Sequence, residues 1–174
     1  MTRLLETIGE LLRYPDEGYA PLLDEAVRLS RDECRSAIER LRERTRGLRL
    51  GELQGLYTRT FDLNPLCSLE VGWQLYGEDY ARGSFIAYMR SVLAAHGVPE
   101  RGELADHLAH VLPAIARMPA EGAEELRENA ALPAVRKMLR IFDRLDNPYS
   151  ELLHAAAILL AMPVSRLEEE PSHV

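Results

Sequence analysis

The residues with the clearest chemical potential lie in one short stretch near the middle of the chain. A helix predicted over residues 102–118 would carry two carboxylates and two imidazoles on one face, namely Glu103, Asp106, His107 and His110. Glu103, His107 and His110 are spaced by four and three residues, so all three could reach one metal ion. One helix supplies few ligands, however, and no HExxH or CxxC pair stands elsewhere in the sequence to complete a site. On the residues alone, a solvated polar face near the positive end of the helix dipole is favoured.

No other catalytic pattern stands out in the sequence. It contains no phosphate-binding P-loop, no GxGxxG fingerprint and no GxSxG nucleophile elbow. Ser68 and Ser84 have no neighbours that would mark them as activated nucleophiles. The sequence therefore favours a protein that is not an enzyme and has no catalytic residues, bound metal or cofactor. A metal-binding helical enzyme that uses the face from Glu103 to His110 is the weakest alternative.

Aromatic side chains gather between Tyr57 and Gly83. This stretch holds Trp73, three of the seven tyrosines and one of the three phenylalanines. Turn signals at Asn64-Pro65 and Gly77 interrupt it, so the aromatics flank loops as well as helices. Each aromatic taken alone fits a helix face packed in a core. Together, beside loops, they indicate a recognition surface.

The elements that must position these residues are all helical. Apolar residues recur at the i, i+3, i+4 spacing, no segment alternates as a strand would, and proline, glycine and asparagine mark the breaks. The predicted helices span approximately 3–13, 20–29, 32–48, 53–60, 68–73, 79–96, 102–118, 120–130, 133–145 and 150–162. Pro113 should kink or break its helix near Leu112. We therefore predict an all-α, single-domain bundle of eight to ten helices.

Charge and length restrict the partners. The 174 residues suit one domain, expected over 1–163, with a frayed acidic tail at 164–174. With 21 Lys and Arg against 28 Asp and Glu, the net charge is −7, which argues against nucleic acid and favours a basic partner.

Membrane insertion and export are not expected either. The most apolar run, residues 152–162, is far shorter than the ~20 residues that span a bilayer, and the N-terminus lacks a signal-peptide pattern. Cys34 and Cys67 have no metal-ligand spacing, so we expect reduced thiols and a cytoplasmic protein.

Several short motifs occur in a definite order. They are Tyr57-x3-Phe61-Asp62, Pro65-x2-Ser68, Tyr76-Gly77-Glu78 and Arg82-Gly83, preceded by Arg13-Tyr14-Pro15-Asp16 and followed by Glu103-Leu104-Ala105-Asp106-His107-Leu108. Across residues 10–120 their order resembles the NarJ/TorD/DmsD family of chaperones that mature molybdenum oxidoreductases, and most of all its NarJ branch. Ala105 departs from the pattern, since that branch usually has proline there.

This resemblance implies a TorD-like fold and a cytoplasmic, system-specific chaperone. Its partner would be the N-terminal segment of a molybdopterin-containing, nitrate reductase-like catalytic subunit, held until the molybdenum cofactor is inserted and the complex assembles. Such segments are basic and partly apolar, which suits an acidic chain with an aromatic groove. The expected peptide-binding residues are Tyr57, Phe61, Trp73 and Tyr76 in the apolar wall, Pro65 and Ser68 in the loop between them, and Glu103, Asp106 and His107 at the polar end.

The Asp106-His107 pair matches a pair that lies beside the client groove in these chaperones. The protein would be a monomer or a dimer. A generic helical adaptor that binds a different protein through the same surface is the alternative.

Overall fold

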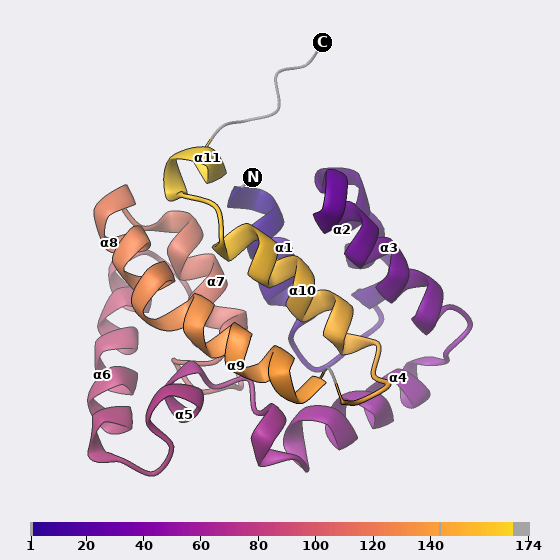
Figure 1. Ribbon diagram of the computed structural model, residues 1–174, viewed down its shortest axis with the longest axis horizontal. Coiled ribbons are helices and arrows are strands. Elements are labelled where there is room, and N and C mark those ends of the chain that lie inside the picture. The colour runs from indigo at the N-terminus through magenta and orange to yellow at the C-terminus, as the bar shows by residue number, and fades with distance from the viewer. Residues whose placement is uncertain (1, 143, 169–174) are drawn as a thin grey trace.

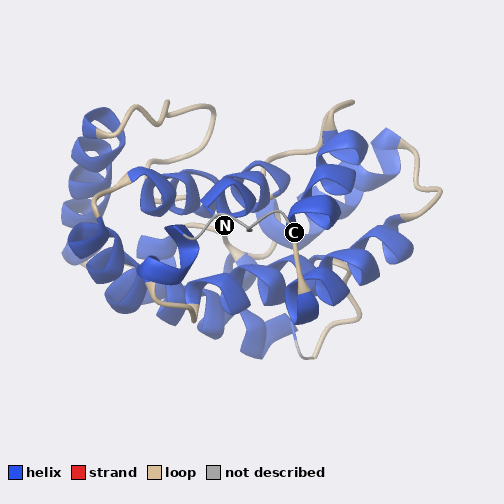
Figure 2. Ribbon diagram, turned by 90° about the horizontal axis from the view of Figure 1, so that it is seen from above, coloured by secondary structure: helices blue, strands red, loops and turns tan. Residues whose placement is uncertain are grey.

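The structure is a computed structural model that describes residues 2–142 and 144–168. Within these residues the protein is all-α, as predicted, and Figure 2 shows helices joined by loops. The α-helices of six residues or more are α1 (Thr2–Leu11), α2 (Tyr19–Leu29), α3 (Asp32–Thr45), α4 (Leu50–Tyr57), α5 (Val71–Tyr76), α6 (Tyr80–Ala95), α7 (Leu108–Arg117), α8 (Ala120–Leu126), α9 (Leu132–Phe142) and α10 (Tyr149–Leu160). The shorter elements are the π-helices η1 (Thr58–Asp62) and η3 (Arg127–Ala131), the 3₁₀-helix η2 (Pro65–Cys67) and α11 (Val164–Glu168).

Two helices from opposite ends of the chain form the centre of the bundle. Helix α1 packs against α2, α7 and α10, and α10 packs against α3 and α9 (Figure 1). Their apolar stripes are fully buried, as Leu5 and Ile8 on α1 and Leu152 and Leu159 on α10 illustrate. The helical periodicity that predicts these elements thus also identifies their buried faces. In the described part of the chain, none of the helices combines the length and apolarity that a membrane span requires.

The contact between α1 and α7 depends on a glycine. A Cβ atom placed on Gly9 would lie 2.8 Å from Cδ of Pro113 and 3.5 Å from the carbonyl oxygen of Ala109. Real Cβ atoms essentially never come within 3.0 Å of a neighbour, and a proline ring has little freedom to move aside. The close approach of the two helices therefore requires the absence of a side chain at position 9.

Replacement of Gly9 by valine should destabilise the protein by about 1–2 kcal/mol. Overpacking of a core contact typically costs 1–3 kcal/mol, and valine's slightly better helix propensity offsets a little of that loss. Gly83→Val is the matched control, because Gly83 is also helical but is exposed and has open space around it. Urea denaturation of both variants would test the contact. Equal losses in the two variants would show that the α1–α7 approach is not tight.

Of the expected kink or break near Leu112, the break does not occur. Helix α7 runs unbroken from Leu108 to Arg117 with Pro113 inside it. Proline at position 113 removes the N–H that would bond to the carbonyl of Ala109. The side chain of Arg13 approaches that carbonyl instead, with Nη2 at 3.5 Å from the oxygen. A tertiary donor thus takes the place of the missing helical one.

The beginning of α7 differs from the prediction in a way that affects the site. The helix starts at Leu108 rather than at residue 102, and residues 103–107 form a loop. Gly102 has φ = +70°, a left-handed conformation that ends helical geometry there. The backbone on either side of His107 bonds to residues 69–71 instead: Leu108 N–H donates to the Leu69 carbonyl (3.0 Å) and Val71 N–H to the Asp106 carbonyl (2.8 Å).

The chain continues as a helix beyond the expected domain boundary at residue 163. Residues 164–168 form α11, which packs against α8, and Val164 and Leu167 are buried. The rest of the expected tail, residues 169–174, lies outside the described residues. We propose that the domain includes α11.

Candidate functional site

The first wall of the site comes from the end of α4. There the helix widens into the π-helix η1, in which Leu63 N–H donates to the carbonyl of Thr58, five residues earlier (3.0 Å). Phe61 points into the core, where its ring centroid lies 4.9 Å from those of Tyr57 and Tyr149. Isolated π-turns within helices are frequent at functional sites. The π-helix brings Asp62, the residue after this buried ring, to the edge of a pocket.

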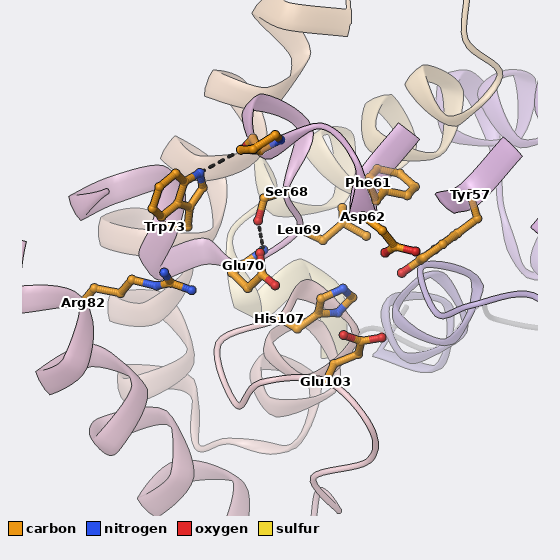
Figure 3. A pocket seen from close by; sticks show the side chains of 11 residues that line it. Tyr57, Phe61, Asp62, Ser68, Leu69, Glu70, Trp73, Arg82, Glu103 and His107 are labelled. Atoms are coloured by element: carbon orange, nitrogen blue, oxygen red, sulfur yellow. Dashed lines mark hydrogen bonds between the residues drawn. The ribbon is translucent and has the colours of Figure 1, made fainter. Parts of the chain in front are cut away.

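The second wall is a loop held in place by side chains of α5. Trp73 donates from Nε1 to the carbonyl of Pro65 (2.8 Å), as Figure 3 shows. Gln74, which is buried, donates from Nε2 to the carbonyls of Leu66 (3.2 Å) and Ser68 (2.8 Å). These side-chain donors give the carbonyls of Leu66 and Ser68 hydrogen-bond partners and add a second donor to that of Pro65, which also accepts from Ser68 N–H (3.4 Å). The loop from residue 65 to residue 68 is therefore fixed relative to α5.

Asp106 holds the beginning of α5. Its side chain is fully buried, and Oδ2 accepts a hydrogen bond from Gly72 N–H (3.0 Å), while its backbone carbonyl accepts from Val71 N–H (2.8 Å). These are two of the donors that a helix leaves unpaired at its first turn. Asp106 is thus a cap supplied from a distant part of the chain. The expectation that Asp106 lies on a solvated helix face is wrong, because the predicted helix does not reach it.

His107 caps the next helix. It is 3% exposed, and its Nδ1 accepts a hydrogen bond from Ala109 N–H in the first turn of α7 (3.1 Å). His110, one turn further, fastens the preceding loop: Nδ1 bonds to the Leu104 carbonyl (2.9 Å) and Nε2 accepts from Arg101 N–H (3.2 Å). Asp106 and His107 together therefore join the first turns of α5 and α7, and neither residue is a surface side chain.

Burial of the His107 ring makes stability dependent on pH. Desolvation, assisted by His110 and Arg13, lowers the pKa of His107 to about 3. Between pH 6.5, the ordinary value for histidine, and pH 3, the unfolded chain binds a proton that the folded chain does not. This residue's contribution to the free energy of unfolding is complete above pH 6.5 and falls by about 1.4 kcal/mol per pH unit below it.

His107→Asn should remove that part of the pH dependence. Asparagine is a good helix cap and can accept from Ala109 N–H, but it does not titrate. Relative to the variant, the wild-type protein should lose about 2 kcal/mol between pH 7.5 and pH 5.0. Urea denaturation at several pH values measures both proteins, and all other titrating groups are common to the two. Parallel stability curves would contradict the buried, neutral imidazole.

The two walls enclose a pocket of about 290 Å³ with the loop before α7 as its third side (Figure 3). Its apolar and aromatic lining comes from Tyr57, Phe61, Pro65, Leu69 and Trp73. Its polar lining comes from Asp62, Ser68, Glu70, Arg82, Glu103 and His107. A concave surface with apolar walls and a few converging polar groups is the usual form of a binding site.

The pocket favours positive charge. Three carboxylates, Asp62, Glu70 and Glu103, face one guanidinium, that of Arg82. Partial burial raises the pKa of Glu103, and the nearby Asp62 carboxylate raises it further. Burial also raises the pKa of Glu70, with Asp106 and Glu103 contributing. The negative forms of these groups are thus under-solvated, and a bound cation would stabilise them.

Most of the residues expected from the sequence do meet at this pocket. Tyr57, Phe61, Pro65, Ser68, Trp73, Glu103 and His107 all line it. Asp106 lies behind the wall as a helix cap, and Tyr76 lies outside the lining, 40% exposed and against the ring of Phe85 (centroids 6.0 Å apart). Their role in peptide binding stays a prediction.

Four lining residues were not expected: Asp62, Leu69, Glu70 and Arg82. Asp62 and Arg82 belong to the ordered motifs found in the sequence, which could have identified them. Glu70 and Leu69 gave no such signal, because they reach the pocket through backbone pairing with the loop at His107.

The alternative of a metal site on one helix face is based on a wrong geometry. Glu103 precedes α7, so helical spacing does not align it with His107 and His110. Both ring nitrogens of His110 bond to backbone atoms. Among the described residues, no group of three or more His, Cys, Asp or Glu side chains is arranged to hold a metal ion.

The fold and the pocket together define an all-α helical-bundle protein with an acidic pocket that is partly lined by aromatic residues. Over residues 21–155 the chain matches the family described as the nitrate reductase delta subunit, and it belongs to that family. This is the NarJ-type family of nitrate reductase assembly chaperones, so the resemblance found in the sequence is confirmed. No curated protein matches the chain. The pocket lies entirely within the matched residues.

Proposed function

We propose that this protein is a dedicated cytoplasmic chaperone for the catalytic subunit of a nitrate reductase-like molybdoenzyme. It binds the N-terminal segment of that subunit while the molybdenum cofactor is inserted and the complex assembles. The observation that carries the proposal is the acidic pocket, partly lined by aromatic residues, inside the region that defines the family.

The composition of the pocket suits a segment with basic and apolar residues. The carboxylates of Asp62, Glu70 and Glu103 attract positive charge, and the net charge of −7 extends that attraction over the whole molecule. The half-buried ring of Trp73 supplies apolar surface beside the charges, and the buried rings of Tyr57 and Phe61 support the pocket from the core side. Weak, reversible binding is appropriate for a chaperone, since the client must leave when it is mature.

Removal of two pocket charges should weaken client binding without unfolding the protein. Asp62→Asn combined with Glu103→Gln should reduce the affinity for a synthetic N-terminal peptide of the catalytic subunit roughly tenfold, which corresponds to about 1.4 kcal/mol. Added salt should weaken wild-type binding, because ions screen charges over ~8 Å at physiological strength. Calorimetry at two salt concentrations measures both effects.

The matched control is Glu121→Gln, a change of the same type at an exposed position of α8 away from the pocket. It should bind like wild type. A scrambled peptide of the same composition tests the alternative of a generic adaptor. If the scrambled peptide binds as tightly as the native one, or if the native one does not bind at all, a dedicated chaperone for this segment is ruled out.

A further inference from the structure

The ring of His107 holds an unused hydrogen-bond donor at the pocket. Because Nδ1 accepts from Ala109 N–H, the neutral ring carries its proton on Nε2. The side chain is 97% buried and lines the pocket, yet Nε2 forms no hydrogen bond within the described residues (Figure 3). Nε2 itself is not shut off from the pocket space, so an acceptor on a ligand can reach it. The ligand of this pocket should therefore offer an acceptor next to His107.

The carboxylates nearest this donor form no salt bridge among the described residues, and the cation that acts on Glu103, Arg13, lies outside the lining, where it bonds to the carbonyls of Arg101 and Ala109. Figure 3 shows Asp62 and Glu103 at the same end of the pocket as His107, with Arg82 at the opposite end. Arg82 is held there, its guanidinium carbon 5.2 Å from the centroid of the Trp73 ring. Burial raises the pKa of Glu103, and the Asp62 carboxylate raises it further, which places these two side chains near each other. We name this part of the pocket, formed by Asp62, Glu103 and His107, the acidic end.

We propose that the acidic end binds the side chain of a single arginine in the client segment. Its guanidinium lies between the carboxylates of Asp62 and Glu103, and a backbone carbonyl beside that arginine accepts the Nε2–H of His107. The proposal rests on the proposed function, because it names the feature of the client that the same pocket selects.

The shape of the pocket favours one long side chain over a whole helix. Its volume of about 290 Å³ is small, and Tyr57, Phe61 and Leu69, which are almost wholly buried, present only narrow apolar edges, enough for a methylene stem on the way to the carboxylates but too little for a helix face. A guanidinium is planar and carries five N–H donors, so it can serve two carboxylates on different sides at once. Lysine offers a compact, strongly hydrated charge and should fit less well.

Peptides in which each arginine is replaced in turn by citrulline test the proposal. Citrulline keeps the length and shape of arginine but lacks its charge. At one position the replacement should weaken binding at least tenfold, and lysine there should weaken it severalfold. In the Asp62→Asn, Glu103→Gln variant the same citrulline replacement should change affinity less than twofold, whereas Glu121→Gln should retain the full effect.

The hydrogen-bond donor Nε2–H of His107 can be tested without a client peptide. The probe is Nα-acetyl-L-arginine N-methylamide. Titration into protein with ¹⁵N-labelled histidine should shift the Nε2 resonance of His107, and it should change the fluorescence of Trp73, the only tryptophan. The citrulline analogue should do neither at the same concentration. In His107→Asn, which keeps the helix cap, arginine-dependent peptide binding should weaken while the melting temperature at pH 7.5 stays close to wild type.

The outcomes separate the two proposals. If the client peptide binds but no single citrulline replacement matters, or if the citrulline and arginine probes act alike, the arginine subsite is refuted and the chaperone function stands. If the arginine probe shifts His107 but no client peptide binds, the subsite stands and the proposed client is wrong.

Discussion

Phe61→Ala is expected to lower the free energy of unfolding by about 3–5 kcal/mol, the usual loss when a buried phenylalanine is truncated. Phe61 is 6% exposed, and its ring meets those of Tyr57, Tyr149 and Phe142 at centroid distances of 4.9, 4.9 and 6.1 Å. Edge-on aromatic pairs add about 0.5–1.5 kcal/mol each beyond the buried area. Phe61 therefore connects the site to the core. Chemical denaturation of Phe61→Ala should show a much lower denaturant midpoint than that of the wild-type protein.

Leu63→Ala is the control for that experiment. Leu63 directly follows the same π-helix but is 71% exposed, so its truncation should change stability by within about 0.5 kcal/mol. A loss below about 1 kcal/mol for Phe61→Ala would mean that the aromatic cluster does not stabilise the fold. The pocket would then lack the rigid wall on which the proposed binding depends.

Asp106→Ala should cost about 2–3 kcal/mol, even though aspartate is usually a surface residue. The substitution leaves Gly72 N–H without its acceptor in a buried position, and an unsatisfied buried donor costs about 1–3 kcal/mol. The small cavity left behind places the loss in the upper part of that range. Because α5 carries Trp73, client-peptide affinity should fall together with stability. Denaturation and calorimetry on the same preparation measure the two losses.

Asp106→Asn distinguishes the hydrogen bond from the charge. Asparagine keeps an oxygen that can accept from Gly72 N–H, and burial already disfavours the charged carboxylate, as the raised pKa of Asp106 indicates. The asparagine variant should therefore retain most of the stability. If Asn and Ala prove equally destabilising, the charge of Asp106 matters rather than its capping bond.

Sequence-based prediction works in this chain for features that depend on neighbouring residues. Periodicity places α1, α2, α6 and α10 within a few residues of their observed bounds, because helix formation depends on contacts three and four residues apart that any sequence displays. The order of short motifs likewise brings together most of the pocket lining. Helical periodicity is a local property, and the order of the motifs can be read along the sequence. Both can be recognised without knowledge of the fold.

The sequence alone thus determined an all-helical fold, an acidic surface charge, the family and most residues of the candidate pocket. Only the tertiary structure decided what Asp106 and His107 do. Residues 106–108 pair with residues 69–71, more than thirty positions away, and this pairing replaces the helical turn that their sequence also permits. Both the helical turn and the pairing with residues 69–71 provide hydrogen-bond partners for the backbone. The packing of segments that are distant in the sequence therefore decides between them. That choice turns an apparent polar helix face into two buried helix caps beside a pocket.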